Sequence, residues 1–117
     1  MKLNQYPDAI AQSKRQLLTA DRMAKQAKFK WEEIIAEMDT AIAFDAELKN
    51  DAQRKARRNE ALKSDACVDA FEFYRVAAER LEDLEIDHTL LLHRFSVAKL
   101  EAQDTISKTE FQAAAAA

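Results

Sequence analysis

The sequence predicts an all-α protein: a long antiparallel helical hairpin, coiled-coil-like, with a short helix at its tip. The 117 residues contain no glycine and a single proline. Glycine and proline supply the backbone angles of tight turns, hairpins and phosphate-binding loops, so most β folds, the dinucleotide-binding fingerprint and the P-loop are excluded. Helix-forming residues dominate, and small or apolar residues recur every three or four positions from Ile10 to Leu48.

The first helix is expected over residues 8–48, because Pro7 suits a first turn and Asp8 complements the helix dipole. A heptad repeat read from Ile10 runs through it and predicts that one side is buried against another helix. Its a positions are Ile10, Leu17, Ala24, Trp31 and Met38, and its d positions are Ser13, Ala20, Ala27, Ile34, Ala41 and Leu48.

The apolar stripe widens in the second half of this helix, where Ile35 and Ile42 add a third apolar position per heptad. A two-helix seam does not need this width, so we expect a third or fourth helix there, through dimerisation into a four-helix bundle. Trp31 is interpreted either as a core anchor or as a hot spot of the dimer. The expected oligomer interface comprises Trp31, Ile35, Met38, Ile42, Phe71 and Tyr74.

A second helix is expected over residues 52–63, after a break in which Asn50 ends the first helix in a left-handed conformation and Asp51 caps the second. The third helix is expected over residues 65–106, with an N-cap at Ser64-Asp65. Pairing it with the first helix would set Phe71 near Phe44, Leu81 near Ile34 and Leu92 near Met23.

Two overlapping stripes run along the third helix and predict a broad buried face. One reads Cys67, Phe71, Tyr74, Ala78, Leu81, Glu85, His88, Leu92, Phe95; the other reads Ala77, Leu81, Leu84, His88, Leu91, Phe95, Ala98, Ala102. We expect one domain over residues 1–112, and we leave the alanines at 113–117 out of the functional argument as a tail that need not be native sequence.

Charge is sorted into blocks along the chain, which its net charge of −3 conceals. The strongest feature is a basic cluster in the short helix, formed by Arg54, Lys55, Arg57 and Arg58. Such a cluster can neutralise a few phosphates, and we consider these four residues as nucleic-acid contacts. The alternative is a salt-bridged surface, because acidic residues flank the cluster and no aromatic residues are interleaved for base stacking.

The segment Leu48-Lys49-Asn50-Asp51-Ala52-Gln53-Arg54-Lys55-Ala56, followed by Glu60-Ala61-Leu62, resembles a stretch that joins two long helices in small coiled proteins of prophages and mobile elements. Such proteins are often encoded near recombination functions. The resemblance therefore implies an accessory role in DNA transactions and no catalytic motif.

Catalytic and metal sites find little support in the sequence. Glu85 and His88 have the Glu-x-x-His spacing of helical di-metal bundles, but His93 lacks a second glutamate at that spacing. We interpret His88 instead as a polar layer that sets the register of the helices. No serine lies in a glycine-framed turn and Cys67 has no activating histidine nearby, so we expect no enzyme and no cofactor.

A lone cysteine, the absence of a long apolar run and a polar first segment lead us to expect a cytoplasmic protein without membrane contact. The leading hypothesis is a non-enzymatic helical interaction or scaffold protein that forms a homodimer and binds a protein partner. The alternatives are an accessory nucleic-acid-binding protein that uses the basic cluster, and a metal-binding helical bundle.

Overall fold

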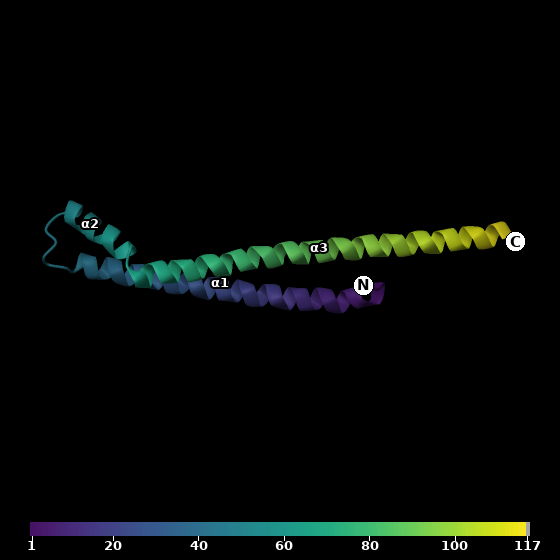
Figure 1. Ribbon diagram of the computed structural model, residues 1–117, viewed down its shortest axis with the longest axis horizontal. Helices are drawn as coiled ribbons and strands as arrows, with labels where there is room; N and C mark the ends of the chain where they lie inside the picture. Colours follow the sequence, from purple (N-terminus) through teal and green to yellow (C-terminus); the bar gives the residue numbers. More distant parts are fainter. Residues whose placement is uncertain (117) are drawn as a thin grey trace. The chain divides into compact units, whose positions relative to one another are not determined.

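The structure is a computed structural model that describes residues 1–116, and these residues contain helices and no strand (Figure 1). The all-α prediction is confirmed. A short 3-10 helix precedes three α-helices: η1 (Leu3–Gln5), α1 (Tyr6–Ala43), α2 (Asp51–Leu62) and α3 (Asp65–Ala116).

The chain divides into two compact units. The expectation of one domain over residues 1–112 stays a prediction. Unit 1 combines Met1–Leu18 with Asp83–Ala117, and unit 2 is the continuous segment Thr19–Glu82. Within each unit α1 and α3 run antiparallel to each other. Only unit 2 contains a third helix, α2.

The first helix ends at Ala43, before the predicted end at residue 48. The side chain of Asp45 accepts a hydrogen bond from the Glu47 N–H at 2.9 Å, and the Asp45 carbonyl accepts one from the Leu48 N–H at 3.3 Å. These local turn bonds replace the helical ladder, since aspartate competes well for nearby backbone donors.

The caps of the other helices were predicted in part. Asn50, expected to end α1 in a left-handed conformation, is extended (φ −147°) and caps α2 by accepting the Gln53 N–H at 2.9 Å. No described residue has a positive φ. Ser64 caps α3 as predicted, accepting the Cys67 N–H at 3.4 Å. The helix then continues past 106 because no glycine or proline follows; residue 117 lies outside the described part.

The heptad predicted for α1 is confirmed from Ile10 to Met38, where its a and d positions are buried or half-buried. Beyond Met38 it fails, because the d position Ala41 is exposed and Leu48 lies outside the helix. In unit 2 the buried residues are small and lie between the two long helices. They are Ala20, Ala24, Ala27 and Cys67. Small residues let helix backbones approach closely, so bulkier neighbours remain at the edges of this seam.

The predicted register between α1 and α3 is wrong. Trp31, not Phe44, contacts Phe71, and Phe44 is 84% exposed. The reason is the direction of α2, which turns back along the end of α1 (Figure 1). Its Arg58 donates a hydrogen bond to Asp39 of α1 at 2.8 Å. Because α2 occupies this end of α1, α3 begins beside α1 a short distance before the end of that helix (Figure 1). The expected pairing of Leu81 with Ile34 shifts as well.

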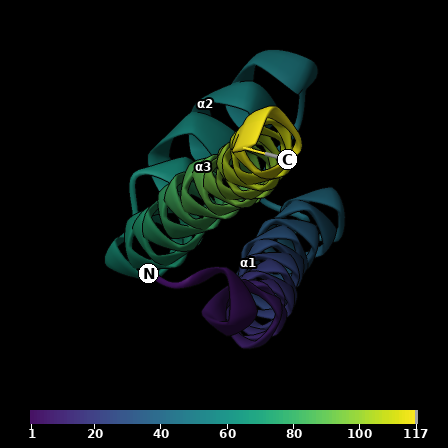
Figure 2. The same ribbon diagram turned by 90° about the vertical axis from the view of Figure 1, so that its right-hand side faces the viewer.

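Unit 1 is a two-helix pair, seen end-on in Figure 2. Tyr6 is 7% exposed and stacks on Phe95 with ring centroids 5.3 Å apart. The second predicted stripe of α3 forms this seam, and its members Leu84, His88, Leu91, Phe95, Ala98 and Ala102 are half-buried. In this unit, Glu85 and Leu92, which belong only to the first stripe, are exposed.

Candidate helix-binding groove

The residues predicted for an oligomer interface lie in unit 2, and three of them contact one another within the chain. The Trp31 ring lies 5.1 Å from that of Phe71 and 5.8 Å from that of Tyr74, measured between centroids. Trp31 is half-buried and Phe71 is 44% exposed. These contacts favour the interpretation of Trp31 as a core anchor, and its role as a hot spot of a dimer stays a prediction.

The other three predicted interface residues, Ile35, Met38 and Ile42, are half-buried on the second half of α1. This is the stretch of α1 to which the Arg58–Asp39 bond holds α2. A helix of the same chain, α2, therefore lies on the stretch of α1 where the wide stripe predicts an additional helix. Whether a second copy also contacts these residues stays a prediction.

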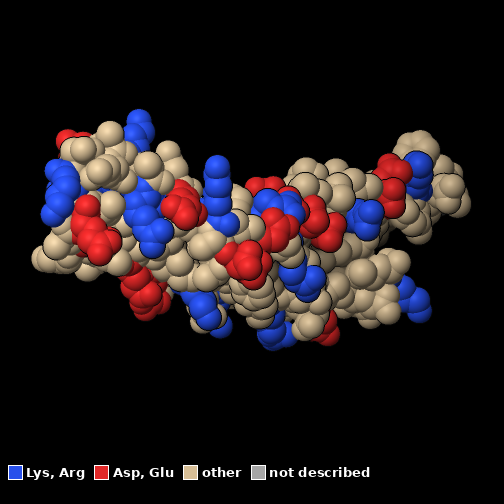
Figure 3. Space-filling view, turned by 60° about the vertical axis from the view of Figure 1, so that its left-hand side comes forward, with Lys and Arg blue, Asp and Glu red and all other residues tan. Residues whose placement is uncertain are grey.

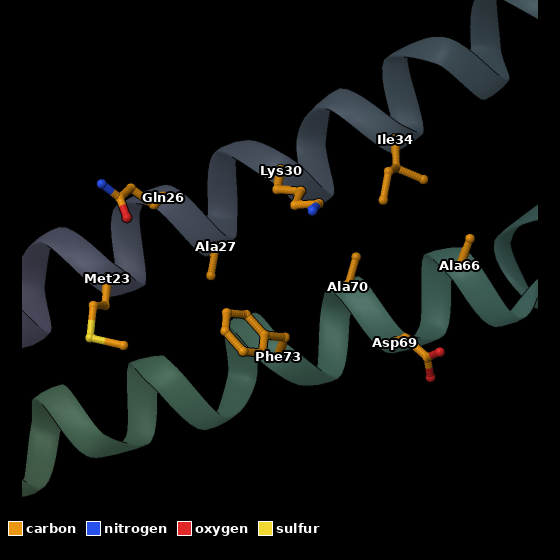
Figure 4. A pocket seen from close by; sticks show the side chains of 9 residues that line it. All are labelled: Met23, Gln26, Ala27, Lys30, Ile34, Ala66, Asp69, Ala70 and Phe73. Atoms are coloured by element: carbon orange, nitrogen blue, oxygen red, sulfur yellow. The ribbon is translucent and has the colours of Figure 1, made fainter.

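An open groove of about 610 Å³ lies between α1 and α3 in unit 2 (Figure 4). Four apolar or alanine side chains of the two helices point into the space between them: Ala27 and Ile34 from α1, and Ala66 and Ala70 from α3. The complete lining is Met23, Gln26, Ala27, Lys30, Ile34, Ala66, Asp69, Ala70 and Phe73.

The groove combines a shallow floor of small residues with bulky walls. The alanines keep the floor low, so the backbone of another helix can approach closely. Phe73 on α3 is 65% exposed and Met23 on α1 is 47% exposed. A flexible methionine and an exposed aromatic ring are side chains that adapt well to a bound apolar surface.

The groove was missed in the sequence analysis, although a signal was present. Residues Ala66, Asp69, Ala70 and Phe73 have i, i+3, i+4, i+7 spacing, which marks one face of a helix. Phe73 lies on neither of the two predicted stripes. The face of α3 that lies beside this part of α1 could be identified only once the register between α1 and α3 was known.

Charged groups lie at the rim of the groove, one on each helix. Lys30 belongs to α1 and Asp69 to α3. Further along α3, Arg75 forms ion pairs with both Glu72 and Glu79. Its hydrogen bond lowers the pKa of the Glu72 carboxyl below the ordinary value of 4.5 and, with its charge, keeps that group ionised.

The predicted basic cluster lies on α2, and three of its four cations are paired with carboxylates. Arg54 is 3.0 Å from Asp51, Arg57 is 3.5 Å from Glu60, and Arg58 is 2.8 Å from Asp39. The hydrogen bond to Asp39 raises the pKa of the Arg58 guanidinium. Basic and acidic side chains are likewise mixed over the face shown in Figure 3. This arrangement favours the salt-bridged interpretation of the cluster.

The side chains weighed for metal binding and catalysis are dispersed. His88 Nδ1 lies 2.9 Å from Ser13 Oγ in the seam of unit 1, which confirms the polar-layer interpretation. Cys67 is 2% exposed. Across residues 1–116, no three side chains of His, Cys, Asp or Glu come together as a metal site would require. No helix in this part of the chain combines the length and apolar character needed to cross a membrane.

Comparison of the chain with protein-family models, curated proteins and solved structures gives no match. The surfaces of the two units are therefore the features that bear on function.

Proposed function

We propose that this chain is a non-enzymatic helical interaction protein that self-associates and binds an amphipathic helix of a protein partner in the groove of unit 2. The groove is the observation that carries this proposal. Its alanine floor and its Met23 and Phe73 walls form an apolar channel along two helices, which is the surface that helix-in-groove recognition uses.

The chemistry of the rim defines the expected partner helix. Its apolar residues would repeat at i, i+3, i+4 and i+7 so that one face fills the channel. An acidic residue on one flank would approach Lys30, and a basic residue on the other would approach Asp69. Charge complementarity of this kind selects the orientation of a bound helix.

The proposal is tested with a designed peptide helix that has this apolar face and these flanking charges, measured by fluorescence polarisation. The variant Phe73→Ser removes an exposed wall of the groove and should weaken binding about tenfold, since a large apolar contact is lost. Phe29→Ser is the matched control, because Phe29 is 68% exposed in the same unit and does not line the groove. Equal binding by the two variants, or no binding by the parent, would contradict the proposal.

Nucleic-acid binding by the basic cluster is the alternative, based on the resemblance of residues 48–62 to prophage and mobile-element proteins. Lys55 is the member of the cluster for which no ion pair is seen among the described residues. Replacing Arg54, Lys55, Arg57 and Arg58 with alanine should abolish low-salt DNA binding if this alternative holds. Failure of the parent to bind DNA at low salt would remove it.

A further inference from the structure

A second apolar stripe runs along α3 in unit 1, away from the seam with α1. This outer stripe consists of Ile86, Leu90, His93, Val97 and Leu100. Its spacing of four, three, four and three residues is that of the a and d positions of a coiled coil. The side chains of its four apolar members are exposed: Ile86 by 59%, Leu90 by 45%, Val97 by 52% and Leu100 by 65%. On a helix, these positions lie nearly opposite the seam residues Leu84, Leu91 and Phe95.

We propose that the outer stripe pairs with the outer stripe of a second copy in antiparallel orientation. This inference rests on the self-association proposed above, and it names the surface and the geometry. The interface expected from the sequence is the Trp31 region, whose aromatic side chains contact one another inside unit 2. Among the described residues of unit 1, no comparable contact is seen for the outer stripe, and its apolar side chains are exposed.

The charges beside the stripe argue for a second copy as its occupant. The e positions on one flank are Asp87, Arg94, Glu101 and Lys108, which alternate in sign from one heptad to the next. The g positions on the other flank are the uncharged Thr89, Ser96 and Gln103. In an antiparallel pair e faces e and g faces g, whereas in a parallel pair e faces g. Only the antiparallel arrangement brings the alternating charges of two copies together.

The same charges restrict the register, and the apolar residues select among the registers that remain. When Ile86 lies opposite Val97 of the second copy, Leu90 lies opposite His93 of the second copy. Asp87 then faces Arg94 of the second copy, and two-fold symmetry forms this ion pair twice. A shift of one helix by one heptad places Arg94 against Arg94 or Asp87 against Asp87, so it is disfavoured. A shift by two heptads pairs opposite charges again but sets Leu90 opposite Ser107 or Glu79, so fewer apolar residues of the stripe meet.

The surface beside the stripe is hollowed rather than flat. A depression of about 350 Å³ is lined by Leu90 and Val97 of the stripe, by Arg94 and Glu101 of the charged flank, and by Met1 across from them. A second helix that packs on the stripe has room for its own flank in this depression.

The test is a charge exchange followed by sedimentation equilibrium of the full chain over a wide concentration range. Asp87→Arg and Arg94→Asp should each weaken dimerisation about tenfold, because each turns two attractive pairs into repulsive ones. The double variant, which carries both changes, should recover the affinity of the parent. These two residues are seven apart on one helix and do not pair within a chain, so recovery reports a contact between copies. Glu85→Arg is the control, because it makes the same charge change outside the stripe and its flanks.

A second pair of variants tests the apolar contact. Leu90→Glu should weaken dimerisation about a hundredfold. Leu92→Glu should leave it unchanged, although Leu92 is exposed to a similar extent, 40% against 45%. Circular dichroism of both variants checks that each is folded.

The outcomes separate the two proposals. A parent chain that is monomeric at every concentration overturns self-association and this inference together, and leaves the groove to its own peptide test. A parent that self-associates, with no effect of Leu90→Glu and no recovery in the double charge variant, overturns the outer stripe alone.

Discussion

The two units use the same pair of long helices and pack them differently. In unit 2 the seam is made of alanines and a cysteine, and the large side chains lie beside it, as Trp31 does against Phe71 and Tyr74. In unit 1 the seam has bulkier residues, a Tyr6–Phe95 stack and a polar Ser13–His88 layer. Close approach of the helices in unit 2 leaves Phe73 outside the seam and creates a groove.

One heptad pattern thus produces two kinds of surface. Unit 2 has a third α-helix and presents an apolar groove, whereas unit 1 has two α-helices and presents an exposed apolar stripe on α3. A channel suits a foreign helix, and a self-complementary stripe suits a copy of itself. We expect unit 2 to be the more stable of the two units, because the aromatic cluster and α2 both belong to it.

The largest expected effect comes from Trp31→Ala, which removes the aromatic anchor of unit 2. We expect a loss of about 2–4 kcal/mol in unfolding free energy, less than for a fully buried tryptophan because Trp31 is half-buried. Denaturant unfolding measures the loss, and amide exchange should accelerate most within residues 19–82. Phe29→Ala, at an exposed position of the same helix, is the control and should cost little. Equal losses for the two variants would show that the cluster does not anchor unit 2.

A smaller effect is expected from the polar layer of unit 1. Ser13→Ala leaves His88 without its hydrogen-bond partner and should cost about 0.5–1.5 kcal/mol. Adding His88→Leu should recover most of this loss, because an apolar pair no longer leaves a polar group unsatisfied. Ser96→Ala is the control, since the Ser96 hydroxyl donates only to the Leu92 carbonyl of its own helix. A double variant less stable than Ser13→Ala would refute this account of the layer.

The smallest effect concerns the ion pairs on the exposed face of α3 in unit 2. The hydrogen bond from Arg75 lowers the pKa of Glu72 in the folded state below its ordinary value of 4.5. The pair therefore stabilises the fold at pH values above 4.5, and this stabilisation is lost as the pH falls below 4.5 through the lowered pKa. Arg75→Gln should therefore lower the melting temperature slightly at neutral pH, and the difference from the parent should vanish in acid.

Arg80→Gln serves as the control for Arg75, because it removes a positive charge from the same helix and no ion pair of Arg80 is seen among the described residues. A difference between Arg75→Gln and the parent that persists unchanged in acid would mean that the ion pairs are not its source.

Much of the local structure could be predicted from residue patterns. The absence of glycine predicted helices throughout, the heptad from Ile10 identified the inward face of α1, and Ser64 was recognised as a cap. His88 was recognised as a polar layer because a histidine in an otherwise apolar stripe needs a partner. Each of these inferences uses neighbours within a few turns of one helix, where spacing determines which side chains share a face.

Residue patterns were sufficient to predict which segments are helical and which faces are apolar. The register, the turning back of α2 onto α1, and the choice between the two stripes of α3 became known from the folded chain. A heptad repeat matches itself again after every seven residues, so it does not state which residue of α1 faces which residue of α3. That choice depends on the Asp45 turn and on the Arg58–Asp39 bond between distant parts of the chain. The groove and the outer stripe are the surfaces that this register leaves uncovered.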